Sequence, residues 1–387
     1  MTYNTLFEPL SIESIKKLGL EKSESNLSTL IKFFYDSKDS QNIEILREIV
    51  SSIGRQNNTN RIYAFLEQEV FKKHYMEVLY QMFRTTLYKA KEDNRFKDLR
   101  DRILKTYNNE VMQKMFEYYE YKQQRNKPKI QTRQITKPSL LIGDNRQSLQ
   151  KIHDGQIQLI FTSPPYYNAR LYSDYVSYQG YLDSMQESLV QCYRILEDGR
   201  FVIINVSPVI TKRAGREFES IRYPIHFDFH RILVESGFYF IDEILWIKPE
   251  YSVPNRIAGY LQTKKPLSYK PNCVTESIMV YRKNSPFLLD KNIKTYNKNL
   301  RNDENVDLTN CWYIAPKYDK NHPAVFPEEL CQKVLKYYSF VGDVVCDPFA
   351  GSGTFGKVAR DMGRIPLLCE QNTEYAEKLK QKGFNEI

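Results

Sequence analysis

VVCDPFAGSGTFGKVAR, residues 344–360, is the most informative stretch of this sequence for the fold. An apolar run leads into three glycines, Gly351, Gly353 and Gly356, which have a G-x-G-x-x-G spacing. Glycines at this spacing permit a tight strand-to-helix turn and a close approach of the backbone to a ligand. Glu370 lies 19 residues after Gly351, at the end of the next predicted strand, where an acid can accept hydrogen bonds from ribose hydroxyls. The stretch predicts a site for a dinucleotide or another adenosine cofactor, with a plain tight turn as the alternative.

The place of this turn in the chain separates the two cofactor classes. In a dinucleotide-binding domain the glycine turn opens the sheet, and several strands follow it. Here only 31 residues follow Gly356, enough for one more strand and a helix. The other strands must therefore come from upstream. This order predicts a circularly permuted sheet, which is unusual for a dehydrogenase.

Apolar runs and amphipathic stretches alternate upstream of the glycine turn. Residues 157–163, IQLIFTS, form a near-continuous apolar run, which is typical of a strand covered on both faces. This alternation predicts an α/β fold with a mostly parallel sheet and helices on both of its faces. We expect strands at 140–144, 157–163, 200–205, 238–248, 273–283, 343–349 and 364–370, and helices at 185–196, 226–235, 327–338 and from about 354.

Residues 1–125 have a different pattern and are predicted to be helical. They contain two glycines and one proline, and apolar residues recur every three or four positions, as in QNIEILREIVSSI (41–53). The segment 121–137 then has six basic residues and no acid, and we interpret it as a linker or an exposed basic segment. The sequence thus predicts an all-α N-terminal domain with a basic linker over 1–137, followed by an α/β domain over 138–387.

Composition and charge restrict the class of protein. The 387 residues are 41% hydrophobic and 27% charged, which excludes collagen-like and wholly disordered chains. No apolar run is long enough for a membrane span, and the six cysteines form no metal-binding pattern, so we expect a reducing cytoplasm and no metal. The net charge of +9 comes from +7 on residues 1–137 and +8 on residues 251–301, with slightly acidic stretches elsewhere. Such basic regions suit a polyanion partner, and solvated lysine faces are the alternative.

A second motif follows the predicted buried strand. It reads TSPPYYN, residues 162–168. Its two prolines stiffen the backbone and leave carbonyls free as acceptors, Ser163 adds another acceptor, and Tyr166 supplies a flat face. A rigid row of acceptors beside an aromatic face suits a planar ligand with an exocyclic amino group. The carboxyl end of a strand is also where open α/β sheets bind ligands. A stiff proline turn with surface tyrosines is the alternative.

Together, TSPPYYN and DPFAGSGT (347–354) resemble the motifs of amino-methyltransferases that modify exocyclic amines in DNA. The order of the two motifs, with a recognition region between them, is similar to the permuted beta class. This resemblance implies a Rossmann-like methyltransferase sheet, S-adenosyl-L-methionine as the cofactor and double-stranded DNA as the substrate. It covers about 138–387 and includes YRILEDGRFVIIN (193–205), ILWIKPE (244–250), ESIMVYRK (276–283) and HPAVFPEEL (322–330).

The residue before the two prolines indicates the target base. Family members with serine there are mostly cytosine-N4 enzymes, and those with aspartate or asparagine are mostly adenine-N6 enzymes. Ser163 therefore points to cytosine N4. An adenine-N6 enzyme of the same fold is the alternative. A non-catalytic nucleic-acid-binding protein with a vestigial cofactor pocket is a further one, although both motifs are intact.

The resemblance also implies roles for single residues. Ser163 and the Pro164 carbonyl would accept the hydrogens of the target amine, and Pro165 and Tyr166 complete the catalytic motif, with Tyr166 stacking on a flipped base. The cofactor residues would be Asp347, Phe349, Gly351, Ser352, Gly353, Thr354, Glu370, Asp144, His322 and Pro323. An ordinary helix-entry histidine is an equal alternative for His322.

The predicted DNA contacts lie outside the two motifs. Residues 284–320 are a short candidate target-recognition insert, and the basic stretch bordering it should face the DNA backbone. The expected phosphate contacts are Arg256, Lys264, Lys265 and Lys270, together with Arg170, for which a solvated arginine is the alternative. A cognate restriction endonuclease and a second copy of the chain are candidate partners, and the expected location is a prokaryotic cytoplasm.

Deleting residues 1–137 is expected to weaken DNA binding and to make the affinity less dependent on salt concentration. The reason is that each lysine or arginine on a phosphate releases a counterion, so the slope of log affinity against log salt concentration (the salt slope) reports the number of such contacts. Neutralising Lys122, Arg125, Lys127 and Lys129 together should reproduce part of this effect. The measurement is duplex affinity over a range of salt concentrations, with S-adenosyl-L-methionine binding, which should persist, as the control. If affinity and slope are unchanged, the N-terminal region is an oligomerisation or partner module.

Overall fold

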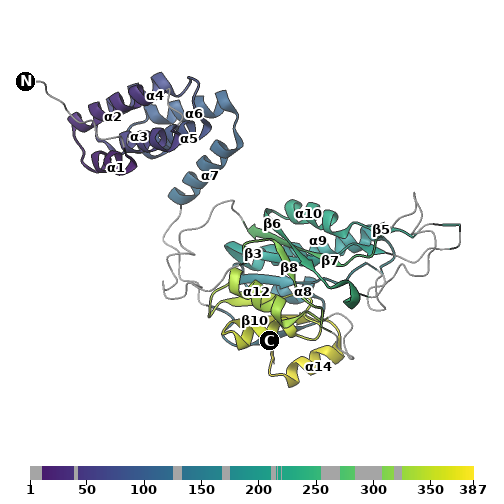
Figure 1. The fold of residues 1–387 in the computed structure, drawn as a ribbon. Helices are drawn as coiled ribbons and strands as arrows, with labels where there is room; N and C mark the ends of the chain where they lie inside the picture. The colour runs from purple at the N-terminus through teal and green to yellow at the C-terminus, as the bar shows by residue number, and fades with distance from the viewer. Residues whose placement is uncertain are drawn as a thin grey trace, which may run out of the picture. The chain divides into compact units, whose positions relative to one another are not determined.

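The computed structural model describes residues 11–38, 42–124, 133–167, 175–210, 215, 217–218, 220–253, 271–283, 307–317 and 325–387. The chain divides into two compact units, Met1–Lys129 and Ile130–Ile387, and this boundary lies within the basic segment 121–137. The first unit is helical and the second is α/β (Figure 1). The predicted fold class is therefore confirmed. No described helix has both the length and the apolar character needed to cross a membrane.

The helical unit is built on helix α3, which packs against α1, α2 and α5. Four of the helices begin at a serine or asparagine, Ser11, Ser23, Asn42 and Asn58, whose side chain accepts a backbone N–H of the first turn. The described helices are α1 (Ile12–Leu20), α2 (Glu24–Ser37), α3 (Ile43–Arg55), α4 (Thr59–Glu69), α5 (Met76–Lys89), α6 (Arg95–Tyr107) and α7 (Glu110–Gln124). Their apolar faces form one core.

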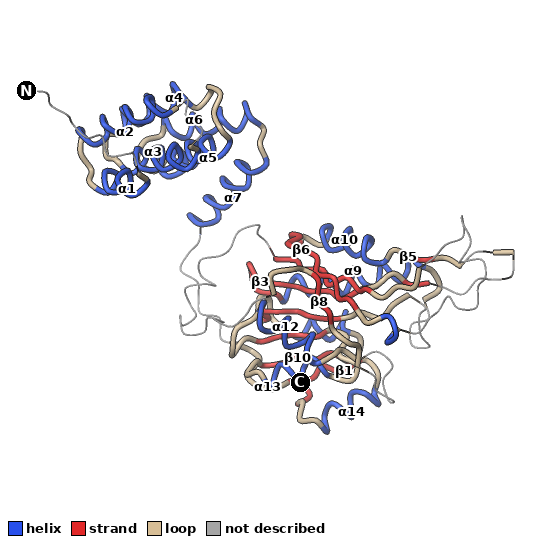
Figure 2. Tube along the Cα trace, viewed as in Figure 1, coloured by secondary structure: helices blue, strands red, loops and turns tan. Residues whose placement is uncertain are grey.

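The α/β unit is built on one sheet with the strand order β11-β1-β10-β9-β2-β3-β7-β6-β8 (Figure 2). Its strands are β1 (Ser139–Ile142), β2 (Ile157–Thr162), β3 (Leu196–Val206), β6 (Phe238–Ile247), β7 (Thr275–Lys283), β8 (Cys311–Tyr313), β9 (Val344–Asp347), β10 (Ile365–Glu370) and β11 (Asn385–Glu386). Within this sheet β7 alone runs against the others. A separate short ribbon pairs β4 (Val209–Ile210) with β5 (Arg222–Tyr223).

The strand order contains the predicted permutation. Strands β9 and β10 come last but two and last but one in the sequence, yet they lie between β1 and β2 in the sheet. Strand β2 pairs with β9 through Leu159 with Val345 and Ile160 with Cys346. The proline motif after β2 and the glycine turn after β9 therefore leave the sheet from neighbouring strands.

Helices cover both faces of the sheet. On one face Ile160 packs with residues of α9 (Tyr178–Ile195) and α10 (Ile225–Glu235), and on the other Leu159 and Phe161 pack with residues of α12 (Glu328–Tyr338) and α13 (Thr354–Asp361). Alternate residues of a strand face opposite sides, so the wholly buried β2 needs a nearly continuous apolar run. The remaining helices among the described residues are α8 (Asn145–Ser148), the 3₁₀ turns η1 (Leu149–Lys151) and η2 (Glu250–Ser252), and α14 (Thr373–Gln381).

Two expectations about single elements are wrong. Helix α9 begins at Tyr178 rather than at residue 185, because Ser177 caps it and its first two turns bury Tyr181 and Leu182. Strand β8 lies within the candidate insert 284–320, where no strand was expected. It pairs with the edge strand β6 through Leu245 with Cys311, a pairing that its local sequence does not signal.

The glycine turn is held by backbone geometry and by packing. Gly351 has φ +51° and Gly353 has φ +78°, both in the left-handed region that favours glycine. A Cβ at Gly353 would lie 2.3 Å from Leu379 Cδ2 of helix α14. A Cβ at Gly356 would lie 2.7 Å from Leu368 Cδ1 of strand β10. The glycines thus let α13 begin directly against its neighbours.

Gly353→Ala is expected to lower the free energy of unfolding of the α/β unit by about 2–4 kcal/mol, because it adds backbone strain and a side-chain clash. Urea unfolding followed by tryptophan fluorescence measures this unit selectively, since both tryptophans, Trp246 and Trp312, lie in its sheet. Gly180→Ala in the first turn of α9 is the matched control and should change stability by no more than about 1 kcal/mol. An equal loss in both variants would contradict the special role of Gly353.

Candidate functional site

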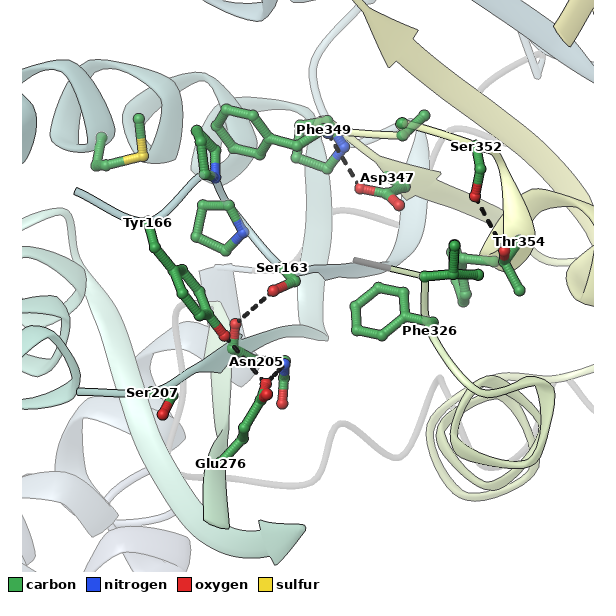
Figure 3. Close-up of a pocket in the computed structure, with 18 of the residues that line it drawn as sticks. Ser163, Tyr166, Asn205, Ser207, Glu276, Phe326, Asp347, Phe349, Ser352 and Thr354 are labelled. Atoms are coloured by element: carbon green, nitrogen blue, oxygen red, sulfur yellow. Dashed lines mark hydrogen bonds between the residues drawn. The ribbon is translucent and has the colours of Figure 1, made fainter. Parts of the chain in front are cut away.

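The carboxyl ends of the parallel strands meet at one edge of the sheet and line a cavity of about 710 Å³. Figure 3 shows the proline motif and the glycine turn on its walls. Because β7 runs the other way, its first residues lie at this same edge. Eleven of the residues predicted for catalysis or cofactor binding line the cavity: Asp144, Ser163, Pro164, Pro165, Tyr166, Asp347, Phe349, Gly351, Ser352, Thr354 and Glu370.

Asp347 is a buried acid at the end of β9. Its Oδ1 accepts a hydrogen bond from Thr162 Oγ1 at 2.6 Å and another from the Phe349 N–H at 3.0 Å. No lysine or arginine of the described ranges forms an ion pair with it. Burial disfavours the charged form, and it raises the pKa of Asp347 to about 7 despite these two hydrogen bonds. The cavity therefore holds a carboxyl group that lacks a described positive partner.

Glu370, at the end of β10, holds the glycine turn in place through a hydrogen bond. Its Oε2 accepts the Gly351 N–H at 2.7 Å, and its Oε1 accepts the Asn372 N–H at 2.7 Å. Burial raises the pKa of Glu370, while the backbone hydrogen bonds oppose that shift. Each carboxylate oxygen has a second lone pair, so both oxygens can accept one more hydrogen bond from a ligand.

Asp144 lies beyond the end of β1 and caps α8. Its carboxylate accepts a two-pronged hydrogen bond from the Arg146 guanidinium, with Arg146 Nε 3.0 Å from Asp144 Oδ1. These hydrogen bonds lower the pKa of Asp144, so it is ionised near neutral pH. The next residue, Asn145, donates from Nδ2 to the Pro348 carbonyl at 2.9 Å and so ties this corner to the glycine turn.

The proline motif presents its polar groups to the other side of the cavity. Ser163 Oγ donates to the Asn205 carbonyl at 3.1 Å, which commits its hydrogen and leaves its lone pairs as acceptors. Tyr166 donates from its hydroxyl to Glu276 Oε2 at 3.0 Å. Burial and the nearby Glu276 carboxylate raise the pKa of Tyr166 well above its ordinary value, so the phenol stays neutral.

Sequence reasoning assigned no role to three residues that meet beside Tyr166. They are Asn205 near the end of β3, Glu276 at the second position of β7 and Lys248 directly after β6. Glu276 accepts from Asn205 Nδ2 (Figure 3). It also forms an ion pair with Lys248. All three lie in segments with a family resemblance. The missing signal is the reversed direction of β7, which brings Glu276 to the cavity edge.

Other predicted residues are not at the cavity or cannot be placed. Gly353 is described, but it packs behind the cavity wall against Leu379. Most of the candidate insert 284–320 lies outside the described residues. So do seven predicted site residues: His322, Pro323, Arg170, Arg256, Lys264, Lys265 and Lys270.

This chain is similar in sequence to known DNA methylases. The DNA methylase family N6_N4_Mtase matches residues 157–381. The orphan methyltransferase M.BamHII of Bacillus amyloliquefaciens is 28% identical over 259 residues, which are 62% of this chain and 92% of that protein. The DNA adenine methyltransferase YhdJ of Escherichia coli K12 is 27% identical over 248 residues, which are 61% of this chain and 79% of that protein.

A solved structure has the same fold. The candidate DNA modification methylase of Thermus thermophilus is 26% identical, and the match covers 64% of this chain and 98% of that one with a TM-score of 0.50. The same Thermus protein has also been solved in complex with S-adenosyl-L-methionine, at a TM-score of 0.49. Because the family match spans more than half of the 387 residues, this chain belongs to the N6/N4 DNA methylase family.

Proposed function

We propose that the chain transfers a methyl group from S-adenosyl-L-methionine to the exocyclic N4 of a cytosine flipped out of duplex DNA. The observation that carries the proposal is one cavity lined by both motifs. The glycine turn and Asp347 form one side, and the acceptors of the proline motif form the other. Its volume of about 710 Å³ lies within the usual range of small-molecule sites. Such a cavity can hold a donor and an acceptor of the methyl group side by side.

The acidic groups support the assignment of the cofactor. When bound, S-adenosyl-L-methionine supplies a methyl group on a positively charged sulfur, and its methionine end carries a further ammonium charge. The buried Asp347 carboxyl, held by two neutral donors, offers the negative charge that such a ligand needs. Glu370 retains lone pairs for ribose hydroxyls while it holds the glycine turn closed. The residues present therefore fit the cofactor.

The proline motif supports the assignment of an amine as substrate. The lone pair of an aromatic amine is delocalised into the ring, which makes the nitrogen a poor nucleophile. Acceptors on both of its hydrogens favour a pyramidal nitrogen, and Ser163 Oγ and the Pro164 carbonyl are suited to that task. The same dipoles stabilise positive charge that develops on the nitrogen. Transfer then depends mainly on positioning the two reactants.

The choice of cytosine rests on the serine before the two prolines. Adenine N6 is the second candidate, because one relative of similar identity is a DNA adenine methyltransferase. Several expectations about partners stay predictions. They are the recognition role of 284–320, a paired endonuclease, a homodimer, and the DNA contacts of Arg170, Arg256, Lys264, Lys265 and Lys270.

The test is to express the chain in a host that lacks its own DNA methyltransferases and to analyse digested DNA by mass spectrometry. We expect N4-methylcytosine, and sequencing of the modified bases then gives the recognition site. N6-methyladenine instead would overturn the choice of base but not the enzyme class. A Tyr166→Ala variant, which lacks the stacking face but leaves the cofactor side intact, is the control and should leave the DNA unmodified. If the folded parent modifies neither base, the catalytic proposal is wrong.

Affinity for S-adenosyl-L-methionine is expected to rise with pH and to level off above about pH 7. The raised pKa of Asp347, about 7, means that this acid is mostly protonated in the free protein at lower pH. A cationic ligand favours its ionised form, so binding releases a proton, and affinity should change by up to about tenfold per pH unit below that value. Calorimetry in buffers of different ionisation enthalpy measures the proton release.

Asp347→Asn is the matched control for this pH dependence. It retains the size of the side chain and an acceptor for Thr162, but it cannot ionise. Its affinity should be lower than the parent's and should not depend on pH in this window. A parent affinity that is flat or falls between about pH 5.5 and pH 8 would contradict the role of Asp347.

A further inference from the structure

We infer that Glu276 is a positioning residue for methyl transfer. In this inference its carboxylate holds the Tyr166 ring and the Asn205 amide in one fixed arrangement beside Ser163. Lys248 acts as its counter-charge. The inference rests on the proposed function, because it treats this side of the cavity as the site of the target base.

Three separate elements meet at the Glu276 carboxylate. Its Oε2 accepts the Tyr166 hydroxyl at 3.0 Å, from the turn after β2, and also accepts Asn205 Nδ2, from the end of β3. Its Oε1 pairs with the ammonium group of Lys248, directly after β6. The side chains of Glu276 and Lys248 are only 12% and 15% exposed. Figure 3 shows Tyr166 and Asn205 converging on this carboxylate.

The arrangement connects the two side chains that act on the base. Ser163 Oγ donates to the Asn205 backbone carbonyl, while the Asn205 side chain donates to Glu276. Tyr166 donates to the same Glu276 oxygen. The positions of the acceptor hydroxyl and of the stacking ring are therefore set relative to one another through Asn205 and Glu276.

The chemistry of the amide makes Glu276 the group that orients Asn205. A carboxylate only accepts hydrogen bonds, so the Asn205 NH₂ must face Glu276 and its Oδ1 must face away. That Oδ1 is buried and has no hydrogen-bond partner among the described residues. Without Glu276, nothing else described would hold the amide in this orientation.

The hydrogen bond to Tyr166 acts at the far end of the ring. A stacking platform has to present its face at a fixed tilt, and a bond to the para hydroxyl restrains that tilt without covering the face. Stacking on an aromatic ring stabilises a flipped base, so a ring that is free to tilt loses part of this stabilisation. The expected loss is in catalytic rate, because the cofactor side of the cavity does not touch Glu276.

The stability of the fold alone does not explain why Glu276 and Lys248 form an ion pair at this place. Such a pair is often no more stabilising than apolar residues of equal volume, whereas removing one partner is strongly destabilising because it leaves a buried charge unpaired. The pair Arg200–Asp343 is also buried, but Arg200 lies in the first half of β3 and Asp343 precedes β9, at the end of the strands away from the cavity. It provides a matched control for the loss of a buried charge in the same sheet.

The experiment compares Glu276→Gln, Tyr166→Phe, the double variant and Asp343→Asn in the full chain. Glu276→Gln keeps the volume and one acceptor oxygen but removes the charge, and Tyr166→Phe keeps the ring but removes the hydroxyl. Each is expected to lower kcat on duplex DNA by about tenfold while the calorimetric Kd for S-adenosyl-L-methionine stays within about twofold. The double variant should be no slower than the slower single variant, because both changes act on the same contact between the Tyr166 hydroxyl and Glu276.

The control separates positioning from stability. Asp343→Asn should lower the urea midpoint followed by tryptophan fluorescence and leave kcat unchanged at a temperature where it is folded. Parental kcat in Glu276→Gln, or rate losses that multiply in the double variant, would overturn the inference. If Glu276→Gln does not fold, Tyr166→Phe decides alone, and parental kcat in that variant overturns it.

If the proposed function is wrong, the same experiment gives a different result. In that case the parent chain modifies no DNA, and the inference is overturned together with it. A parent that methylates adenine instead of cytosine overturns only the choice of base, and the expectations for Glu276 stay the same.

Discussion

One hydrogen bond joins the two sides of the cavity. Thr162, the last residue of β2, donates from Oγ1 to Oδ1 of Asp347, the last residue of β9, at 2.6 Å. The proline motif begins at the next residue after Thr162, and the glycine turn follows Asp347 directly. Because β2 and β9 are paired neighbours, this bond fixes the spacing of two motifs that lie 185 positions apart. A change of register between these strands would separate the two halves of the site.

Three buried or partly buried carboxyl groups line the same cavity, and each has a different set of hydrogen-bond donors. Asp347 has two neutral donors, Glu370 has two backbone N–H groups and Glu276 has a lysine, a phenol and an amide. A buried charge is costly unless it is paired. Glu276 is therefore compensated within the protein and serves as a fixed support. Asp347 is compensated least, which makes it the group most sensitive to a cationic ligand.

Much of the fold could be predicted from local pattern. The apolar run of β2 indicated a strand buried on both faces, and the glycine spacing with few residues after it indicated the permuted order, because both properties are local in the sequence. The beginning of α9 and the existence of β8 were not predicted. The first has a local signal in the Ser177 cap and the buried Tyr181 and Leu182, whereas the second depends on pairing with β6, which is distant in sequence.

The residues of the site also fall into two groups, those predicted from the sequence and those found only in the structure. The sequence alone identified Ser163, Tyr166, Asp347 and Glu370 as neighbours of one ligand site, since each lies in a short contiguous motif at a predicted strand end. Only the folded chain shows that Asn205, Lys248 and Glu276 join them. These residues come from three strands, and they meet because β7 runs against its neighbours and presents its first residues at the edge where β3 and β6 end. Strand direction is set by the packing of the whole sheet, and no short stretch of sequence encodes it.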